Sequence, residues 1–199
     1  MKKVAILILL ASITGCAFGT RHAELSYPPS ASDGGSLIAS AHPEASVAGK
    51  SREVVVQVSD QRDSRERIGN VRNGFGMDTA DVITNDDLNL WVKSALISEL
   101  ANAGYTIVAD GGRATGDDAI ALDAEILEVY CDVYISFDAD ISMKVTLSGK
   151  DIQPLPRTYE GDGSVGVAWD LTAKGFAESL SLALQDAISK ILADMAEFR

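Results

Sequence analysis

The C-terminal segment of the chain constrains its fold more than any other part. From Thr172 onward, apolar residues recur at the spacing of an α-helix and form one stripe, made of Phe176, Leu180, Ala183, Leu184, Ala187, Ile188, Ile191, Leu192 and Met195. This pattern predicts an amphipathic helix whose apolar face must be buried. Either a partner protein or the chain's own sheet covers that face, and we favour the sheet because strand patterns precede the helix.

Those strand patterns alternate between apolar and polar residues. Residues 137–147 alternate without a fault, which predicts a strand with one buried and one solvated face. Residues 120–135 also alternate, but the apolar phase shifts by one residue at Leu127, which predicts a β-bulge or a turn. A further strand over residues 157–168 has two glycines on its buried face, which indicates close approach of the last helix.

The first half of the domain contributes one helix and two more strands. Glu53–Ser59 predicts a central strand, residues 84–102 a helix, and Tyr105–Ala109 a short strand. Residues 60–83 between them are predicted to be a long connection with a turn at Asn73-Gly74. The order β-α-β-β-β-β-α predicts an α+β fold, a two-layer sandwich in which two amphipathic helices pack on one face of a mostly antiparallel sheet.

The N-terminus has the features of a lipoprotein signal. Two lysines precede an apolar run over residues 4–13, which is too short to span a bilayer and fits the h-region of a signal peptide. The run ends at Ile13-Thr14-Gly15-Cys16, which resembles a bacterial lipobox. By that resemblance, residues 1–15 are a cleaved signal peptide and Cys16 is the lipidated first residue of the mature chain. The next residue, Ala17, resembles the sorting signal for the outer membrane.

Residues 16–52 are predicted to be the lipidated cysteine and a flexible tether, and residues 53–199 a single α/β domain. Ala, Ser, Gly and Pro fill 21 of the 36 positions from 17 to 52. Such a segment buries too little apolar surface to offset the entropy of its ordering. Within it, Ala23–Tyr27 has the pattern of a short edge strand that docks on the domain.

Composition excludes several functions. The formal charge is −12 and becomes −14 when the two lysines of the signal peptide are removed, so the domain repels nucleic acid. Lipidation of Cys16 leaves Cys131 without a disulfide partner, and we predict it to be a small apolar filler. His22 and His42 both lie in the tether, which excludes a histidine-based catalytic or zinc site on the domain. We therefore predict no catalytic residue, no metal and no cofactor.

Four arginines form the candidate binding site. They lie in the 60–83 connection, where their guanidinium groups can hold a phosphate or a carboxylate, and they are Arg62, Arg65, Arg67 and Arg72. Three acids, Asp60, Asp63 and Glu66, interleave with them. Local ion pairing therefore competes with ligand binding and is the favoured interpretation.

Several segments resemble the YajG-type lipoproteins of Gram-negative bacteria. The resemblance starts with the lipobox and the polar tether and continues through Val56–Arg62, a strand that ends in an Asp-x-Arg turn. It covers Leu100–Tyr105 at the end of the first helix. It is closest at Arg157-Thr158-Tyr159-Glu160-Gly161 and continues along the last helix to Ala193-Asp194-Met195. The resemblance implies a location in the cell envelope and no established reaction.

The sequence as a whole predicts a non-enzymatic envelope lipoprotein, a binding or accessory subunit for an outer-membrane or cell-wall assembly. Its expected location is the periplasmic face of the outer membrane. The expected partners are the membrane, through Cys16, and an envelope protein or cell-wall component; the oligomeric state is left open. The alternative is a carboxylate-dependent hydrolase of cell-wall glycan, for which the candidate acids are Asp123, Glu125, Asp138 and Asp140. The solvated face of a sheet explains these acids better.

Overall fold

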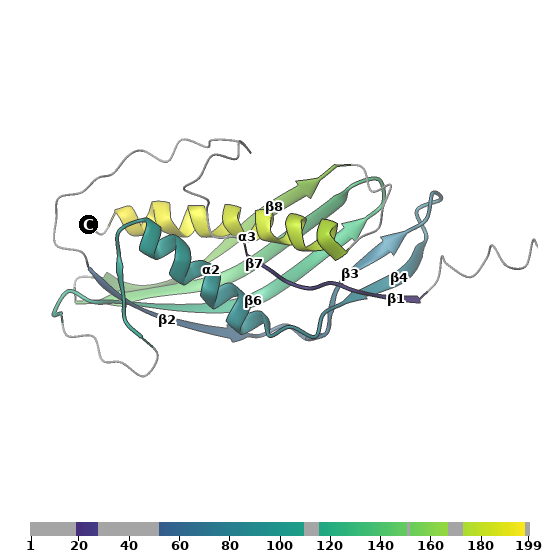
Figure 1. The fold of residues 1–199 in the computed structure, drawn as a ribbon. Coiled ribbons are helices and arrows are strands. Elements are labelled where there is room, and N and C mark those ends of the chain that lie inside the picture. The colour runs from purple at the N-terminus through teal and green to yellow at the C-terminus, as the bar shows by residue number, and fades with distance from the viewer. Residues whose placement is uncertain (1–18, 28–51, 110–115, 151, 167–172, 198–199) are drawn as a thin grey trace, which may run out of the picture.

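The computed structural model describes residues 19–27, 52–109, 116–150, 152–166 and 173–197, and Figure 1 shows their arrangement. The predicted signal peptide, Cys16 and residues 17–18 and 28–51 of the predicted tether lie outside these ranges. Eight strands form one sheet: β1 (Gly19–His22), β2 (Glu53–Asp60), β3 (Arg67–Arg72), β4 (Asp78–Ile83), β5 (Thr106–Ile107), β6 (Ile120–Val133), β7 (Phe137–Gly149) and β8 (Ile152–Val165). The helices in these ranges are α2 (Leu88–Asn102) and α3 (Ala173–Ala196). Neither helix is long and apolar enough to cross a membrane.

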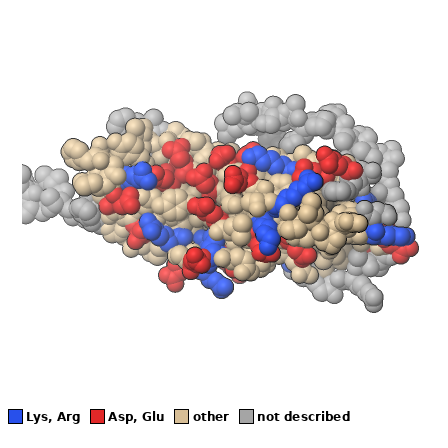
Figure 2. Space-filling view, turned by 180° about the vertical axis from the view of Figure 1, so that it is seen from behind, with Lys and Arg blue, Asp and Glu red and all other residues tan. Residues whose placement is uncertain are grey.

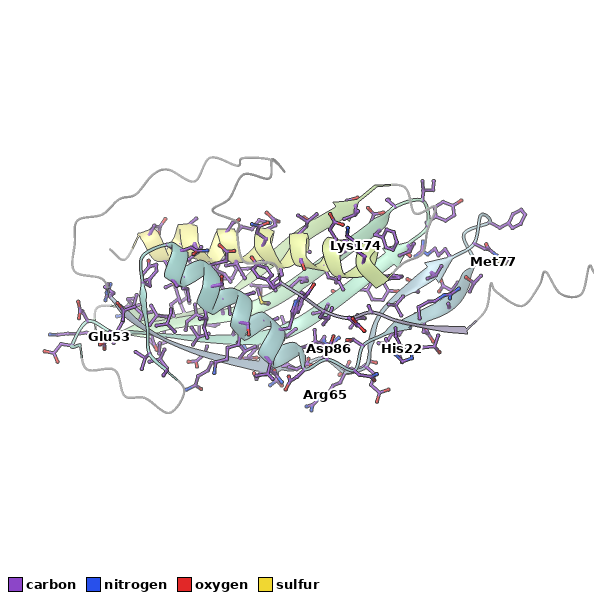
Figure 3. The ribbon with its side chains drawn as sticks, viewed as in Figure 1. His22, Glu53, Arg65, Met77, Asp86 and Lys174 are labelled. Carbon is purple, nitrogen blue, oxygen red and sulfur yellow. The ribbon has the colours of Figure 1, made fainter. Side chains whose placement is uncertain are left out.

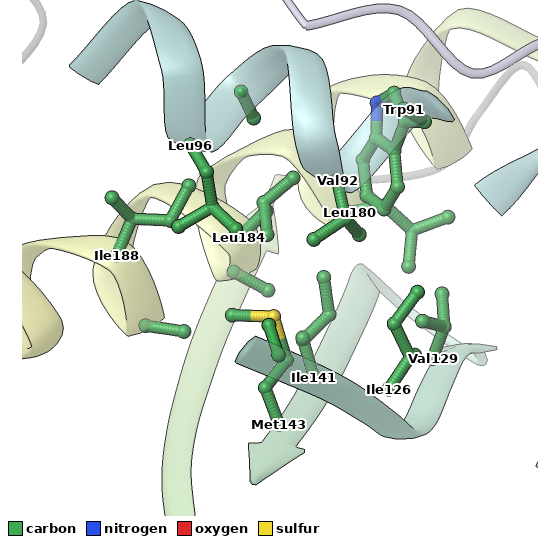
Figure 4. Close-up of a cluster of buried hydrophobic side chains, with 14 of the residues drawn as sticks. Trp91, Val92, Leu96, Ile126, Val129, Ile141, Met143, Leu180, Leu184 and Ile188 are labelled. Atoms are coloured by element: carbon green, nitrogen blue, oxygen red, sulfur yellow. The ribbon is translucent and has the colours of Figure 1, made fainter. Parts of the chain in front are cut away.

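The two helices lie against one side of the sheet, and the core lies between the helices and the sheet (Figure 1). Apolar side chains of both helices meet those of β6 and β7 there, as Figure 4 shows for Trp91, Val92, Leu96, Ile126, Val129, Ile141, Met143, Leu180, Leu184 and Ile188. The predicted α+β class is confirmed, and the apolar stripe of the last helix is buried within the chain.

The sheet is mixed, so the prediction of a mostly antiparallel sheet is not confirmed. Among the described strands, β3 with β4, β6 with β7 and β7 with β8 are antiparallel. The parallel pairs are β1 with β4, β2 with β5, β2 with β6 and β3 with β6. The helix α2 explains part of this difference, because a helical connection returns the chain to the end where β2 began and makes the next strands parallel to it.

β6 is central because strands pair along both of its edges. β7 follows one edge throughout, whereas β2 pairs with residues 120–126 of the other edge and β3 with residues 131–133. Between these two stretches, Ile126 faces Met143 and Glu128 faces Ser142, so that Leu127 is an extra residue in β6. The predicted bulge is therefore confirmed, and it lies where the outer partner of β6 changes.

The predicted long connection over residues 60–83 is wrong, because most of it is a hairpin of β3 and β4. The turn between these strands spans residues 73–77, and the Asn73 side chain accepts hydrogen bonds from the backbone N–H groups of Phe75 and Met77. Asn73 and Gly74 belong to this turn, but it is longer than the predicted two-residue turn. The positive φ of 79° falls at Gly76.

Residues 19–27 of the predicted tether lie against the domain. β1 pairs in parallel with β4, and the N–H of Ala23 donates to the carbonyl of Ile83 over 2.9 Å. The Tyr27 hydroxyl donates to Glu99 on α2 over 2.8 Å. The docked strand therefore precedes the predicted edge strand, since β1 ends at His22 and residues 23–27 continue without strand pairing.

The predicted close approach between the third long strand and the last helix is confirmed. A Cβ atom added at Gly161 would lie 2.1 Å from the carbonyl oxygen of Ala183, and one at Gly163 would lie 2.2 Å from that of Ser179. Both distances are far inside van der Waals contact, so only glycine allows β8 and α3 to pack at this separation.

Candidate functional site

Arg62, the first of the candidate arginines, is buried and holds its own loop together. Its Nε and Nη2 donate to the two carboxylate oxygens of Asp60 over 3.0 and 2.9 Å. Its guanidinium also donates to the backbone carbonyls of Arg65 and Arg67. The Asp60 pKa is lowered, because the hydrogen bonds and charge of Arg62 outweigh the effect of burial, which raises it. Arg62 therefore stabilises the turn after β2.

The other three arginines do not converge on one cleft. Arg67 pairs with Asp81 over 3.0 Å, and Arg72 pairs with Asp78 over 3.4 Å and with Asp132 over 3.0 Å. Arg65 is exposed, forms no side-chain ion pair with the described residues, and points away from the ribbon in Figure 3. Ion pairing within the hairpin and its neighbours therefore accounts for three of the four guanidinium groups.

The candidate acids lie on the face of the sheet that the helices leave open. Figure 2 views the molecule from behind and shows acidic side chains gathered on this face, with basic residues among them. Glu125 forms an ion pair with Lys144 over 3.1 Å, and Asp138 accepts hydrogen bonds from the hydroxyls of Ser136 and Ser164. Asp123 is exposed and faces Thr146 on β7.

Asp140 differs from the other acids on this face. It lies opposite Asp162 on β8, and its pKa is raised by partial burial and by the negative charge of Asp162. A raised carboxyl pKa beside a second carboxylate is a property of many general acids. Both side chains are exposed on the sheet surface, however, and no described pocket encloses them.

A pocket of about 320 Å³ lies at the opposite end of the sheet, beside the C-terminal end of α3. Its apolar wall comes from the β7–β8 hairpin: Val145, Leu147, Ile152, Pro154 and Leu155. Its polar side chains are Gln153, Arg157, Tyr159 and Asp194. A half-open hollow of this size, with an apolar wall and a few converging polar groups, can accept a small ligand or a side chain.

Hydrogen bonds to one oxygen atom join the polar residues of this pocket. Nη1 of Arg157 donates to Oδ2 of Asp194 over 2.6 Å, and the Tyr159 hydroxyl donates to the same oxygen over 2.7 Å. β8 places Arg157 and Tyr159 two residues apart, on one face of the strand. The last turns of α3 place Asp194 above them. These three residues belong to the two segments at which the resemblance to known lipoproteins is closest.

The hydrogen bonds fix the protonation of the pocket. The hydrogen bond from Tyr159, together with the hydrogen bond and charge of Arg157, holds the Asp194 pKa below its ordinary value, against the opposing effect of burial. Burial and the contact with Asp194 raise the pKa of Tyr159 to about 12. At neutral pH the pocket therefore contains an ionised carboxylate and a neutral phenol. A carboxyl group that is ionised at neutral pH has no proton to donate, so Asp194 is poorly suited to be a general acid.

Sequence reasoning missed this site. Both segments carry the resemblance described above, but nothing in either shows that they meet, because Arg157 and Asp194 lie 37 positions apart in the chain. One signal was present: Arg157 and Tyr159 lie on the same face of the strand as Gly161 and Gly163, and that face is the one predicted to approach the last helix.

The buried Cys131 fits its predicted role as a filler, since its thiol contacts Ser179 and burial raises its pKa to about 12.

The fold defines the broad class of the protein, an α+β domain that solved structures share. The protein XCC0632 from Xanthomonas campestris matches with a TM-score of 0.52 and 12% identity, over 90% of this chain and 95% of that chain. A second crystal structure, of a protein described only as uncharacterized, matches with a TM-score of 0.50 and 11% identity, over 72% of this chain and 92% of that chain. At these identities the likeness shows the fold alone.

The sequence match is more specific. The profile of a family described as "Uncharacterized lipoprotein" (Lipoprotein_16) matches residues 39–197. That range is well over half of the chain, so the chain belongs to this lipoprotein family. A search of curated proteins finds no match. The prediction of a bacterial lipoprotein is thus confirmed at the level of the family.

Proposed function

We propose that the chain is a non-enzymatic binding protein of the cell envelope, anchored by lipid on Cys16 to the periplasmic face of the outer membrane. The family match and the lipobox support the anchor. The YajG-type resemblance supports the location. The observation that carries the binding role is the pocket between the β7–β8 hairpin and α3, with Arg157, Tyr159 and Asp194 at its polar side.

The pocket fits an apolar side chain of a partner protein, next to a group that accepts hydrogen bonds. Leu155 is 63% exposed at the pocket although it is a large aliphatic residue, so its surface is available for burial in a complex. Arg157 uses Nη1 for Asp194, and its side chain remains 47% exposed. A partly exposed guanidinium beside an apolar wall can hold a carboxylate or carbonyl of a peptide.

The alternative, a carboxylate-dependent glycan hydrolase, has less support. Such enzymes need two carboxyl groups on either side of the bond that is cleaved, one of them with a raised pKa. Asp194 is the one carboxyl group among the described residues that line the pocket, and its pKa is lowered. The carboxyl group with the raised pKa, Asp140, lies on the open sheet face and does not line this pocket. The binding role therefore remains the better proposal.

Site-specific photocrosslinking in intact cells tests the proposal. A photoreactive residue replaces Leu155 in the full chain, and a matched one replaces Asp123, which is exposed on the open face of β6. We expect a discrete crosslinked product at position 155, its loss when Arg157→Ala is added, and none at position 123. Equal products at both positions, or a product that survives Arg157→Ala, would count against the pocket.

A second experiment separates binding from hydrolysis. Purified peptidoglycan is incubated with the purified protein, and released fragments are analysed by mass spectrometry. We expect no release. A release that disappears in Asp140→Asn or Asp194→Asn would instead establish the hydrolase.

A further inference from the structure

Two hairpin turns expose large apolar side chains at one end of the molecule. In the β3–β4 turn, Phe75 is 89% and Met77 58% exposed; in the β6–β7 turn, Tyr134 is 47% and Ile135 64% exposed. Figure 3 shows Met77 at this end, away from the helices and the core. These four are half of the eight large apolar residues that are exposed in the described chain, and they come from two turns only. We call them the tip patch.

The tip patch has a fixed shape, because contacts join the two turns that form it. The Tyr134 hydroxyl donates to the carbonyl of Gly74 over 3.2 Å. Below the turns, Arg72 on β3 pairs with Asp132 on β6 over 3.0 Å. The Asn73 side chain fixes the backbone of its turn through the N–H groups of residues 75 and 77. No fold requirement accounts for Phe75, since its side chain is almost fully exposed. Exposed apolar patches on such a frame mark interaction sites.

The chain enters the domain at this same end. β1 runs parallel to β4, with Gly19 opposite Ala80 and His22 opposite Ile83, so its first residue lies near the start of β4 and the turn that precedes it. Figure 1 shows the beginning of β1 beside the β3–β4 hairpin. Three residues of chain reach at most about 11 Å, so Cys16 is held within that distance of Gly19 whatever its conformation.

We propose that the tip patch contacts the lipid interface of the membrane that holds the acyl chains of Cys16. This inference rests on the proposed lipid anchor. Tyrosine, here Tyr134, is enriched at the interface between lipid headgroups and acyl chains, and an exposed apolar side chain such as Phe75 is stabilised by burial there. Next to the two turns, Arg72 pairs with both Asp78 and Asp132, and Asp138 accepts hydrogen bonds from two serine hydroxyls. These charges have a small acidic excess, so the patch suits a bilayer that is mainly zwitterionic.

The contact orients the domain. The acyl chains already supply the membrane affinity, and the tip patch sets which end faces the bilayer. β7 begins next to the tip patch, and its 13 residues span about 43 Å at about 3.3 Å each. The pocket of Arg157 and Asp194 lies at the far end of that strand, and the contact thus holds it away from the membrane, toward the periplasmic space.

Depth measurement with a spin label tests this orientation. The mature acylated chain carries Phe75→Cys, and a matched chain carries Leu155→Cys at the other end, where the apolar residue is 63% exposed. Cys131 is buried and Cys16 is acylated, so the new thiol takes the label. Each protein is reconstituted in vesicles of mainly phosphatidylethanolamine with some phosphatidylglycerol. Collision rates with oxygen and with a water-soluble nickel chelate are then compared.

We expect the ratio of oxygen to nickel collisions to rise severalfold at position 75 on reconstitution and to stay at its aqueous value at position 155. Equal ratios at both positions in an acylated protein would overturn the tip contact while leaving the anchor intact. Shielding at position 75 that depends on the ratio of protein to lipid would show that a second copy covers the patch, and would also overturn it. A mass without acyl chains would overturn the anchor itself, and this inference with it.

Discussion

Arg157 donates a hydrogen bond of 2.6 Å to Asp194, and this contact ties β8 to the last turns of α3 across 37 positions of the chain. Tyr159 donates to the same oxygen, so removing Asp194 leaves two donors without their acceptor at once. The structural and the proposed binding roles of the pocket therefore depend on one carboxylate.

Asp194→Asn is expected to lower the free energy of unfolding by about 1 kcal/mol at pH 7, a small value because the ion pair is partly solvated. The folded-state pKa of Asp194 lies below its ordinary value, so its contribution is present above that ordinary value and is lost as pH falls through the folded pKa. Urea unfolding between pH 7 and pH 2 measures the difference. It should shrink toward zero at the acid end, and a constant difference would contradict this account.

Gly161→Ala is expected to destabilise the domain by about 3 kcal/mol or more, because the new Cβ would lie 2.1 Å from a backbone oxygen of α3. Gly74→Ala is the matched control, since no atom lies within 4 Å of the Cβ that would be added there. Thermal unfolding of the two variants measures the effect. Equal melting temperatures would show that α3 does not pack on β8 at this distance.

Leu184→Asp is expected to unfold or aggregate the domain, because the side chain is 0% exposed in the core (Figure 4) and would carry an unpaired charge. Leu182→Asp, two residues away on α3, is the control, as its side chain is 37% exposed. Circular dichroism during heating distinguishes them. A cooperative transition of Leu184→Asp near that of the wild type would contradict the covered stripe.

The sequence predicted those elements whose pattern is local. Alternation in residues 137–147, the phase shift at Leu127 and the apolar stripe of α3 each arise from neighbouring positions, and each is confirmed. The hairpin of β3 and β4 was missed because its burial depends on distant partners. Gly69 is covered by the backbone of Cys131, and the side chain of Asn70 accepts from Tyr130 and donates to Asp78. When these distant partners are unknown, the sequence pattern of such residues predicts a loop.

For the same reason, local sequence patterns could not predict the direction of the strands or the position of the pocket. β2 and β3 share one edge of β6, on either side of the bulge, and no periodicity in either strand encodes this pairing. The candidate arginines were chosen by their density in sequence. Arg62 pairs with the interleaved Asp60, whereas the hairpin fold brings Asp78, Asp81 and Asp132 to Arg67 and Arg72. Among the described residues, Asp63 and Glu66 form no ion pair with the four arginines.

Arg62→Ala tests whether the first of these arginines is structural. The pair of Arg62 and Asp60 has side chains that are only 5% and 8% exposed, and removing one partner of a buried pair costs about 3–5 kcal/mol. The carbonyls of Arg65 and Arg67 would lose a donor as well. The matched control is Arg67→Ala, because Arg67 and Asp81 are 43% and 60% exposed and such pairs contribute about 0–1 kcal/mol. Urea unfolding at pH 7 compares the two variants, and a loss for Arg62→Ala no larger than that for Arg67→Ala would return Arg62 to the candidate ligand-binding residues.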